Sequence, residues 1–246
     1  MDRHNNVEHM SDLRQDPTGS AATTTTPHRA FMPTHPHHQA KAADAFTSLV
    51  DHVVQQEWDQ FQDVHNEGGR AACQGNWPVF HQMRASQFLT WSMPLLQSYS
   101  DDLNYAEESG RNLLSEKYGR MMVSTAPEQF AESIAPYLAT LSADRIAQQE
   151  RIIATQIAWV IEFRHAYPKL GQAMRLIHTS EDSQYATSFE TYLRGELSTY
   201  SARTLDYYEA LIASCKRNNL NLTQETVEKT VQLGGYKDLE EAEASQ

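Results

Sequence analysis

The sequence is poor in cysteine and contains no long apolar run. Its two cysteines, Cys73 and Cys215, lie far apart, a pattern that excludes a disulfide framework and a zinc ribbon and fits a reducing compartment. No apolar segment reaches the length of a membrane span, and the N-terminal residues lack the apolar centre of a signal peptide. We therefore expect a cytoplasmic protein with no membrane partner.

Basic residues are also scarce. The chain has 20 Lys and Arg against 32 Asp and Glu, which gives a net charge of −12. The basic footprint of a nucleic-acid-binding protein is missing, so we expect no nucleic-acid partner. The 246 residues are enough to build one sizeable core.

The N-terminal segment, residues 1–42, differs in composition from the rest. It is rich in Thr, Pro and His and holds too few large apolar residues to pack, so we predict a disordered tail. Its histidines are irregularly spaced and present no fixed geometry to a metal. We predict that residues 43–246 form the folded, helical domain.

From residue 43 onward, apolar residues recur at helical spacing, without the alternation typical of strands. The predicted fold class is all-α, a single compact multi-helix bundle. Residues 187–215 lack proline and are predicted to form one helix of about eight turns. The Thr125-Ala-Pro-Glu128 capping box predicts another helix start.

Several predicted helices carry a charge on or at the rim of the apolar face. Within residues 187–215, Glu190 lies inside the apolar arc, while Arg194 and Glu196 lie at its edges. Burying such a charge without a partner costs several kcal/mol, so each case needs a reason. The ionisable groups placed in this way on five segments are Glu57, Arg84, Asp102, Lys117 and Glu190, and Gln156 adds an uncharged polar group on a sixth.

Two hypotheses account for these charges. In the first, which we favour, they line an open polar pocket of an enzyme of small-molecule metabolism. Glu190, Glu57 and Asp102 would then supply acid–base groups, with Tyr200 or Tyr192 as a proton donor.

In that pocket, Arg84 and Lys117 would hold an anionic group of a small-molecule ligand, and Arg194 and Gln156 would bind beside them. In the second hypothesis the protein is non-catalytic, binds a ligand or partner, and uses the charges as a structural ion-pair network. A cavity of a few hundred cubic ångströms lined by these residues would favour the first hypothesis. The sequence identifies no cofactor and no oligomeric state.

Metal binding and thiol chemistry have weak support. Glu162 and His165 have the ExxH spacing of di-iron helices, but the helical wheel places both on the outer side, and a second such motif is missing. We assign no metal ligands, although a carboxylate-only magnesium or manganese site from Glu57, Asp102 and Glu190 stays an alternative. Cys73 follows a glycine-rich turn, but without an identified histidine base we interpret it as a small loop residue.

Seven blocks of the sequence resemble a helical domain family of bacteria and fungi that is of unknown function. The resemblance covers about residue 45 to the C-terminus and implies one compact domain, without implying an activity. The same blocks contain the charged residues found on the apolar faces. The blocks are EW at 57–58, NEGGRAACQ at 66–74, FHQMRASQFLTW at 80–91, SYSDDL at 98–103, GRNLLSEKYGRMM at 110–122, SFETYLRGELSTYS at 188–201 and GYKDLEEAE at 235–243.

Overall fold

The structure is a computed structural model that describes residues 36–64 and 72–246. Within these ranges the chain forms helices and helical turns and no strand beyond one isolated bridge between Ser183 and Ala186, which confirms the all-α prediction. The longer helices are α1 (Pro36–Gln62), α2 (Trp77–Phe88), α3 (Met93–Glu108), α4 (Leu113–Thr125), α6 (Ala143–Ala166), α8 (Phe189–Leu197), α9 (Ala202–Arg217) and α10 (Leu222–Leu233). The shorter elements are η1 (Ala72–Gly75), α5 (Pro127–Gln129), η2 (Phe130–Ile134), η3 (Ala135–Tyr137), α7 (Pro168–Gln172), η4 (Thr179–Glu181) and α11 (Leu239–Ser245).

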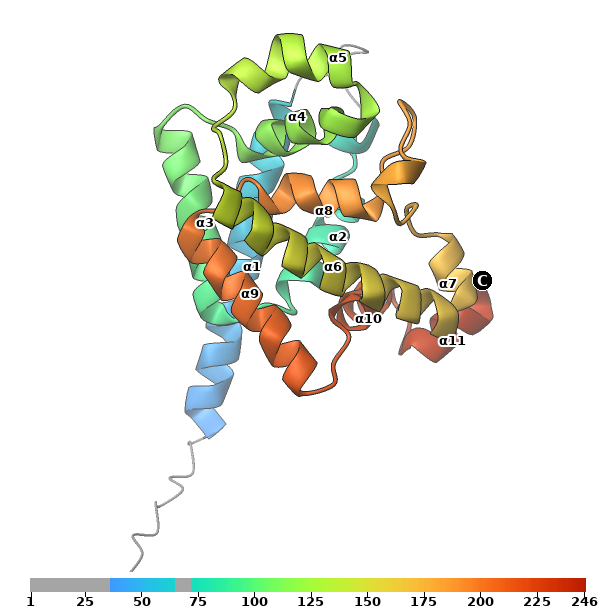
Figure 1. Ribbon diagram of the computed structural model, residues 1–246. Helices are drawn as coiled ribbons and strands as arrows, with labels where there is room; N and C mark the ends of the chain where they lie inside the picture. Colours follow the sequence, from blue (N-terminus) through green and yellow to red (C-terminus); the bar gives the residue numbers. More distant parts are fainter. Residues whose placement is uncertain (1–35, 65–71) are drawn as a thin grey trace, which may run out of the picture.

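Helix α8 lies inside the bundle (Figure 1), where it packs against α4 on one side and α6 on another. Helix α1 packs against α2, α3 and α4, while α9 packs against α3 and α6. Helix α10 joins α2 to α6, and a smaller apolar cluster ties α11 and α7 to that end of the bundle. The buried faces of eight helices therefore share one main core around α8.

Most helix starts are fixed by a local side-chain cap. A Ser, Asn or Asp side chain accepts a hydrogen bond from the backbone N–H three residues ahead, which satisfies one of the unpaired donors of the first turn. These caps are strictly local, so the sequence alone marks where such helices begin. The capping residues are Asn76, Ser92, Asn112, Ser142, Ser188, Ser201, Asn221 and Asp238.

The predicted continuous helix over residues 187–215 was wrong. The chain turns a corner between Leu197, the end of α8, and Ala202, the start of α9, and Ser201 caps the new helix. Arg145 of α6 donates from Nη2 to the carbonyls of Leu197, Ser198 and Tyr200. Because a distant guanidinium satisfies the carbonyls that the break exposes, the periodicity of the segment itself does not reveal the break.

Two other boundaries also differ from prediction. The capping-box segment gives only the short α5, a π-turn (η2) and η3, because Pro136 has no N–H to continue a helix. Helix α1 begins at Pro36, so helical structure starts earlier than residue 43. The rest of the predicted tail, residues 1–35, lies outside the described residues.

No helix in the described part of the chain is both long enough and apolar enough to span a membrane.

Candidate functional site

Four charged side chains from four helices meet inside the bundle, and we call them the central ion cluster. They are Glu57 of α1, Arg84 of α2, Lys117 of α4 and Glu196 of α8, with exposed fractions of 0, 6, 3 and 3%. Charged residues are rarely buried to this extent unless they are paired. The cluster holds two cations and two carboxylates, so its formal charges balance.

Arg84 binds Glu57 through two parallel hydrogen bonds. The Nε atom lies 2.5 Å from Oε2 and the Nη2 atom lies 2.6 Å from Oε1, a bidentate arrangement that fixes both groups in one plane. The hydroxyl of Tyr99 on α3 donates to the same Oε1 at 2.7 Å. One carboxylate therefore connects α1, α2 and α3.

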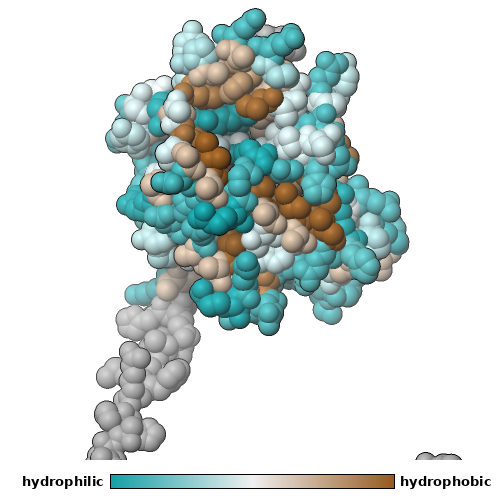
Figure 2. Space-filling model, in the orientation of Figure 1, coloured by the Kyte–Doolittle hydropathy of each residue, from teal (hydrophilic) through white to brown (hydrophobic). Residues whose placement is uncertain are grey.

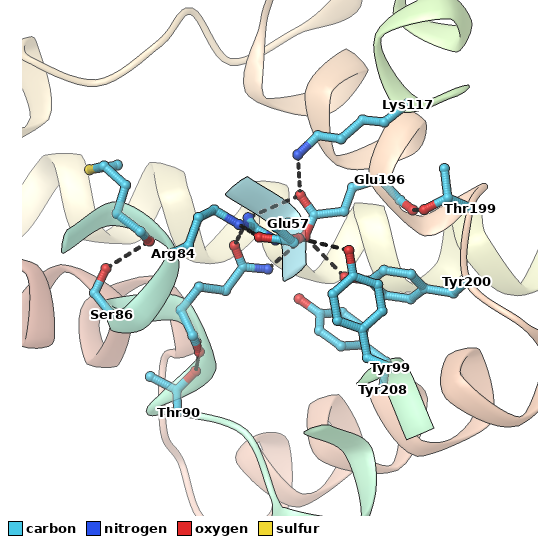
Figure 3. Close-up of polar contacts among 12 residues, drawn as sticks. Glu57, Arg84, Ser86, Thr90, Tyr99, Lys117, Glu196, Thr199, Tyr200 and Tyr208 are labelled. Atoms are coloured by element: carbon cyan, nitrogen blue, oxygen red, sulfur yellow. Dashed lines mark hydrogen bonds and ion pairs between the residues drawn. The ribbon is translucent and has the colours of Figure 1, made fainter. Parts of the chain in front are cut away.

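The second carboxylate of the cluster, that of Glu196, accepts hydrogen bonds from several side chains (Figure 3). Lys117 Nζ lies 2.7 Å from Oε2, and Arg84 Nη2 lies 3.3 Å from Oε1. Gln87 Nε2 and the hydroxyl of Tyr200 also donate to Oε1, at 2.8 and 2.9 Å. Every carboxylate oxygen in the cluster is thus hydrogen-bonded, as a buried polar network requires.

Gly195 explains how Glu196 reaches Lys117. A Cβ atom on Gly195 would lie 2.9 Å from the Lys117 carbonyl oxygen and 3.0 Å from Met121 Cγ, closer than ordinary contact. The missing side chain therefore lets the backbones of α8 and α4 approach each other, and the next residue along α8 then meets the ammonium group.

Burial and neighbouring charges shift the pKa of Glu196 and of the two tyrosines that contact the cluster, Tyr99 and Tyr200, away from their ordinary values. Burial by itself would raise the pKa of Glu196, but the charges of Arg84 and Lys117 outweigh it and hold that pKa well below its usual range. Burial and the charge of Glu57 raise the pKa of Tyr99, and burial and the charge of Glu196 raise that of Tyr200. At neutral pH Glu196 stays ionised and both tyrosines stay protonated, whereas a general acid or base works best with a pKa near the working pH.

Glu190 and Arg194, which we expected beside Arg84 and Lys117, form a separate cluster nearer the surface. Arg194 Nη2 lies 2.7 Å from Oε1 of Glu190, four residues earlier on α8, and its Nε lies 2.7 Å from Glu150 Oε1. The three side chains are 19 to 45% exposed. The helical wheel placed the wrong glutamate of α8 in the interior, because Glu196, assigned to the rim, is the buried one.

Asp102 and Gln156 also lie in other surroundings. Asp102 is partly buried and accepts a hydrogen bond from the Ser201 backbone N–H at 2.9 Å, while Gln156 is buried and donates to the Tyr208 hydroxyl at 3.0 Å. The predicted residues that meet are therefore Glu57, Arg84 and Lys117, and the ring centroid of Tyr192 lies 3.8 Å from Lys117 Nζ. Tyr200, expected as a proton donor, contacts them through Glu196.

The described residues include no group of three or more His, Cys, Asp or Glu side chains placed to hold a metal ion. Glu162 and His165 are exposed on α6, which confirms the wheel's placement of both on the outer side. The side chain of Cys73 lies outside the described part, and Cys215 is buried with a raised pKa caused by that burial.

A cavity of about 230 Å³ lies at the corner between α8 and α9, next to the ends of α3 and α6. We call it the arginine cavity, because Arg111, Arg120 and Arg145 line it together with Asp102 and Glu116. Figure 1 shows the segment that follows η3 descending to the start of α6, and Ala139 and Leu141 of that segment line the cavity. Tyr200 also lines the cavity, whereas Glu57, Arg84 and Lys117 do not.

The three arginines differ in how well their donors are satisfied. Arg111 binds Glu116 through two hydrogen bonds of 2.7 and 2.8 Å. Arg120 donates from Nη2 to the Ala139 carbonyl at 2.8 Å, and Arg145 donates from Nη2 to the α8–α9 corner. The Nε atoms of Arg120 and Arg145 are buried and have no hydrogen-bond partner among the described residues.

Sequence reasoning missed both of these arginines. Arg120 stands three residues after Lys117 in the GRNLLSEKYGRMM block. This spacing within one helix could have indicated Arg120 as a second candidate basic residue. Arg145 carries no such signal, because its partners are carbonyls of a corner about fifty residues away.

The fold and the cluster together define an all-α domain whose helices are joined through a buried, charge-balanced ion network. The chain belongs to the family described as "Protein of unknown function (DUF4125)", whose model matches residues 47–244. This bears out the resemblance drawn from the sequence blocks. Neither the curated proteins nor the solved structures include a match to this chain.

Proposed function

We propose that this protein is a non-catalytic ligand-binding protein, that its ligand carries an anionic group, and that the arginine cavity holds that group. The observation that carries the proposal is that three arginines, Arg111, Arg120 and Arg145, line one cavity with only two carboxylates beside them. An excess of positive charge around a cavity attracts an anionic ligand.

The charge of the cavity supports the same proposal. Arg111, Arg120 and Arg145 stand against the two carboxylates of Asp102 and Glu116, which leaves one positive charge uncompensated in a chain of net charge −12. Burial lowers the pKa of Arg145 and the charge of Arg120 lowers it further, while burial and then the charge of Arg111 lower that of Arg120. An anion would relieve both effects, because it stabilises the charged guanidinium forms.

In this proposal the central ion cluster is structural. The anion-binding role expected for Arg84 and Lys117 passes to the arginine cavity, since Glu57 and Glu196 already neutralise both cations. An acid–base role for Glu57 has no support from the geometry, because its carboxylate is bound on both oxygens. The competing proposal, an enzyme of small-molecule metabolism, would need a reacting group with access to a cavity. A cytoplasmic location and the lack of a nucleic-acid partner stay proposals that depend on composition.

The test measures thermal stability and calorimetric binding with sodium acetate and with sodium phosphate, at an ionic strength held constant with sodium chloride. A ligand that binds the folded state raises the melting temperature as its concentration exceeds Kd. We expect such a rise for the wild type and its loss in Arg120→Gln. Arg203→Gln is the matched control, because Arg203 is an exposed arginine paired with Asp101 at 2.7 Å and should keep the response. If neither anion binds the wild type, or if Arg120→Gln binds equally well, the proposal is wrong.

A further inference from the structure

A second cavity, of about 620 Å³, adjoins the arginine cavity. Ala139, Leu141 and Arg145 line both cavities, so a ligand in the first has space beside it in the second. Figure 2 shows hydrophobic surface over the segment that leads into α6 and again along α6, with hydrophilic surface between them. The polar side chains that line the second cavity therefore indicate what the ligand carries besides its anionic group.

Two hydrogen-bond acceptors on the first turns of α6 line the second cavity. Asp144 is exposed, and its carboxylate has no hydrogen bond or ion pair with a described residue. Gln148 donates from Nε2 to Asp206 and to Glu209, at 2.9 Å in both cases. Because carboxylates only accept, these contacts fix the orientation of the amide and leave its Oε1 as a second acceptor.

These two acceptors lie together and can be reached. Asp144 and Gln148 stand four residues apart on α6, so their side chains are neighbours on one face of the helix. The Oε1 atom of Gln148 is not among the enclosed polar atoms without a partner. A group with several N–H donors and a positive charge, such as a primary ammonium, can therefore bind both oxygens.

The charges around the two cavities have opposite signs. Three arginines line the first cavity against two carboxylates. In the second, Arg151 is paired with Glu209 at 3.2 Å. The carboxylate of Asp144 is then the uncompensated charge, once Arg145, which lines both cavities, is counted with the first. The two cavities together are close to neutral, so a ligand with separated negative and positive charges complements them better than an anion alone.

We infer that the ligand is a small zwitterion, with its anionic group in the arginine cavity and a primary ammonium group bound by Asp144 and Gln148 in the second cavity. This inference rests on the proposed function, because it names the class of ligand for the same site. It adds a requirement that the proposed function does not make, namely that a positive charge on the ligand raises its affinity.

The experiment compares calorimetric affinities of the full chain for amino acids with a terminal amine and for the carboxylates that lack the amine. The pairs are glycine with acetate, β-alanine with propionate, 4-aminobutyrate with butyrate and 6-aminohexanoate with hexanoate, at constant ionic strength. We expect the amino acid to bind at least about threefold more tightly in the pair whose length matches the two cavities, a gain within the range of an exposed ion pair. Its N-trimethylated analogue should lose most of this gain, because it keeps the charge but has no N–H donor.

An uncharged variant of Asp144 tests the ammonium site directly. Asp144→Asn should lower the affinity of that amino acid to about the affinity of its carboxylate, without weakening the carboxylate itself. Unchanged binding of the carboxylate also shows that the variant is folded. Asp59→Asn is the matched control, because Asp59 is an exposed aspartate of α1 that lines neither cavity, and it should change neither affinity.

The outcomes distinguish this inference from the proposed function. Equal affinities within every pair, or no effect of Asp144→Asn on the amino acid, would refute the ammonium site while leaving the anion site in place. Equally tight binding of the N-trimethylated analogue would refute the primary ammonium class. Failure of both acetate and phosphate to bind would refute the proposed function, and with it the inference that rests on it.

Discussion

Replacing Glu196 with glutamine tests whether the central ion cluster is structural. The change removes one negative charge and leaves two cations with one carboxylate. Arg84 keeps its bidentate contact with Glu57, so Lys117, which is 3% exposed, becomes the unpaired charge. The rings of Tyr192 and Tyr118, whose centroids lie 3.8 and 6.0 Å from Nζ, remain beside it, and aromatic rings replace only part of the lost attraction.

The expected cost is about 3–5 kcal/mol in the free energy of unfolding, the usual result of breaking a buried ion pair by removing one partner. Urea melts followed by circular dichroism measure it, with the m-value checked for two-state behaviour. Glu150→Gln is the matched control. Glu150 is 45% exposed and its partner Arg194 keeps Glu190, so we expect a loss below about 1 kcal/mol.

A double variant identifies the cause of the loss. Lys117→Met combined with Glu196→Gln removes both members of the pair, so no unpaired charge is left behind. We expect the double variant to be more stable than the sum of the two single losses predicts, because residues in one ion network are not additive. A loss below about 1 kcal/mol in Glu196→Gln, or simple additivity in the double variant, would refute the structural role of the cluster.

Two further predictions concern the same part of the molecule. Because the folded-state pKa of Glu196 is depressed, its contribution to stability is present above the unfolded-state pKa of about 4.3 and is lost as pH falls below it; urea melts from pH 7 to pH 3 should show this loss, and Glu196→Gln should show a shallower one. Gly195→Ala should cost about 1–3 kcal/mol through overpacking against the Lys117 carbonyl, whereas Gly75→Ala, where an added Cβ meets nothing within 4 Å, should be close to neutral; equal melting midpoints for the two alanine variants would contradict the packing argument.

The sequence by itself determined the fold class and most helix starts. Caps such as Ser92 and Asn112 act over three residues, and the apolar periodicity of each helix is likewise a local property. It also identified Glu57, Arg84 and Lys117 as charges that face the interior, because a charge in an apolar stripe is visible without knowing its partner.

Only the tertiary structure decided which charges meet. The choice between Glu190 and Glu196 depends on how α8 is rotated against α4, and Glu196 is separated from Lys117 by 79 residues. The end of α8 depends on Arg145, which satisfies carbonyls more than fifty residues away. The arginine cavity also depends on the tertiary structure, because its walls come from several helices. The sequence pattern of a single helix does not tell how far its side chains lie from those of another helix.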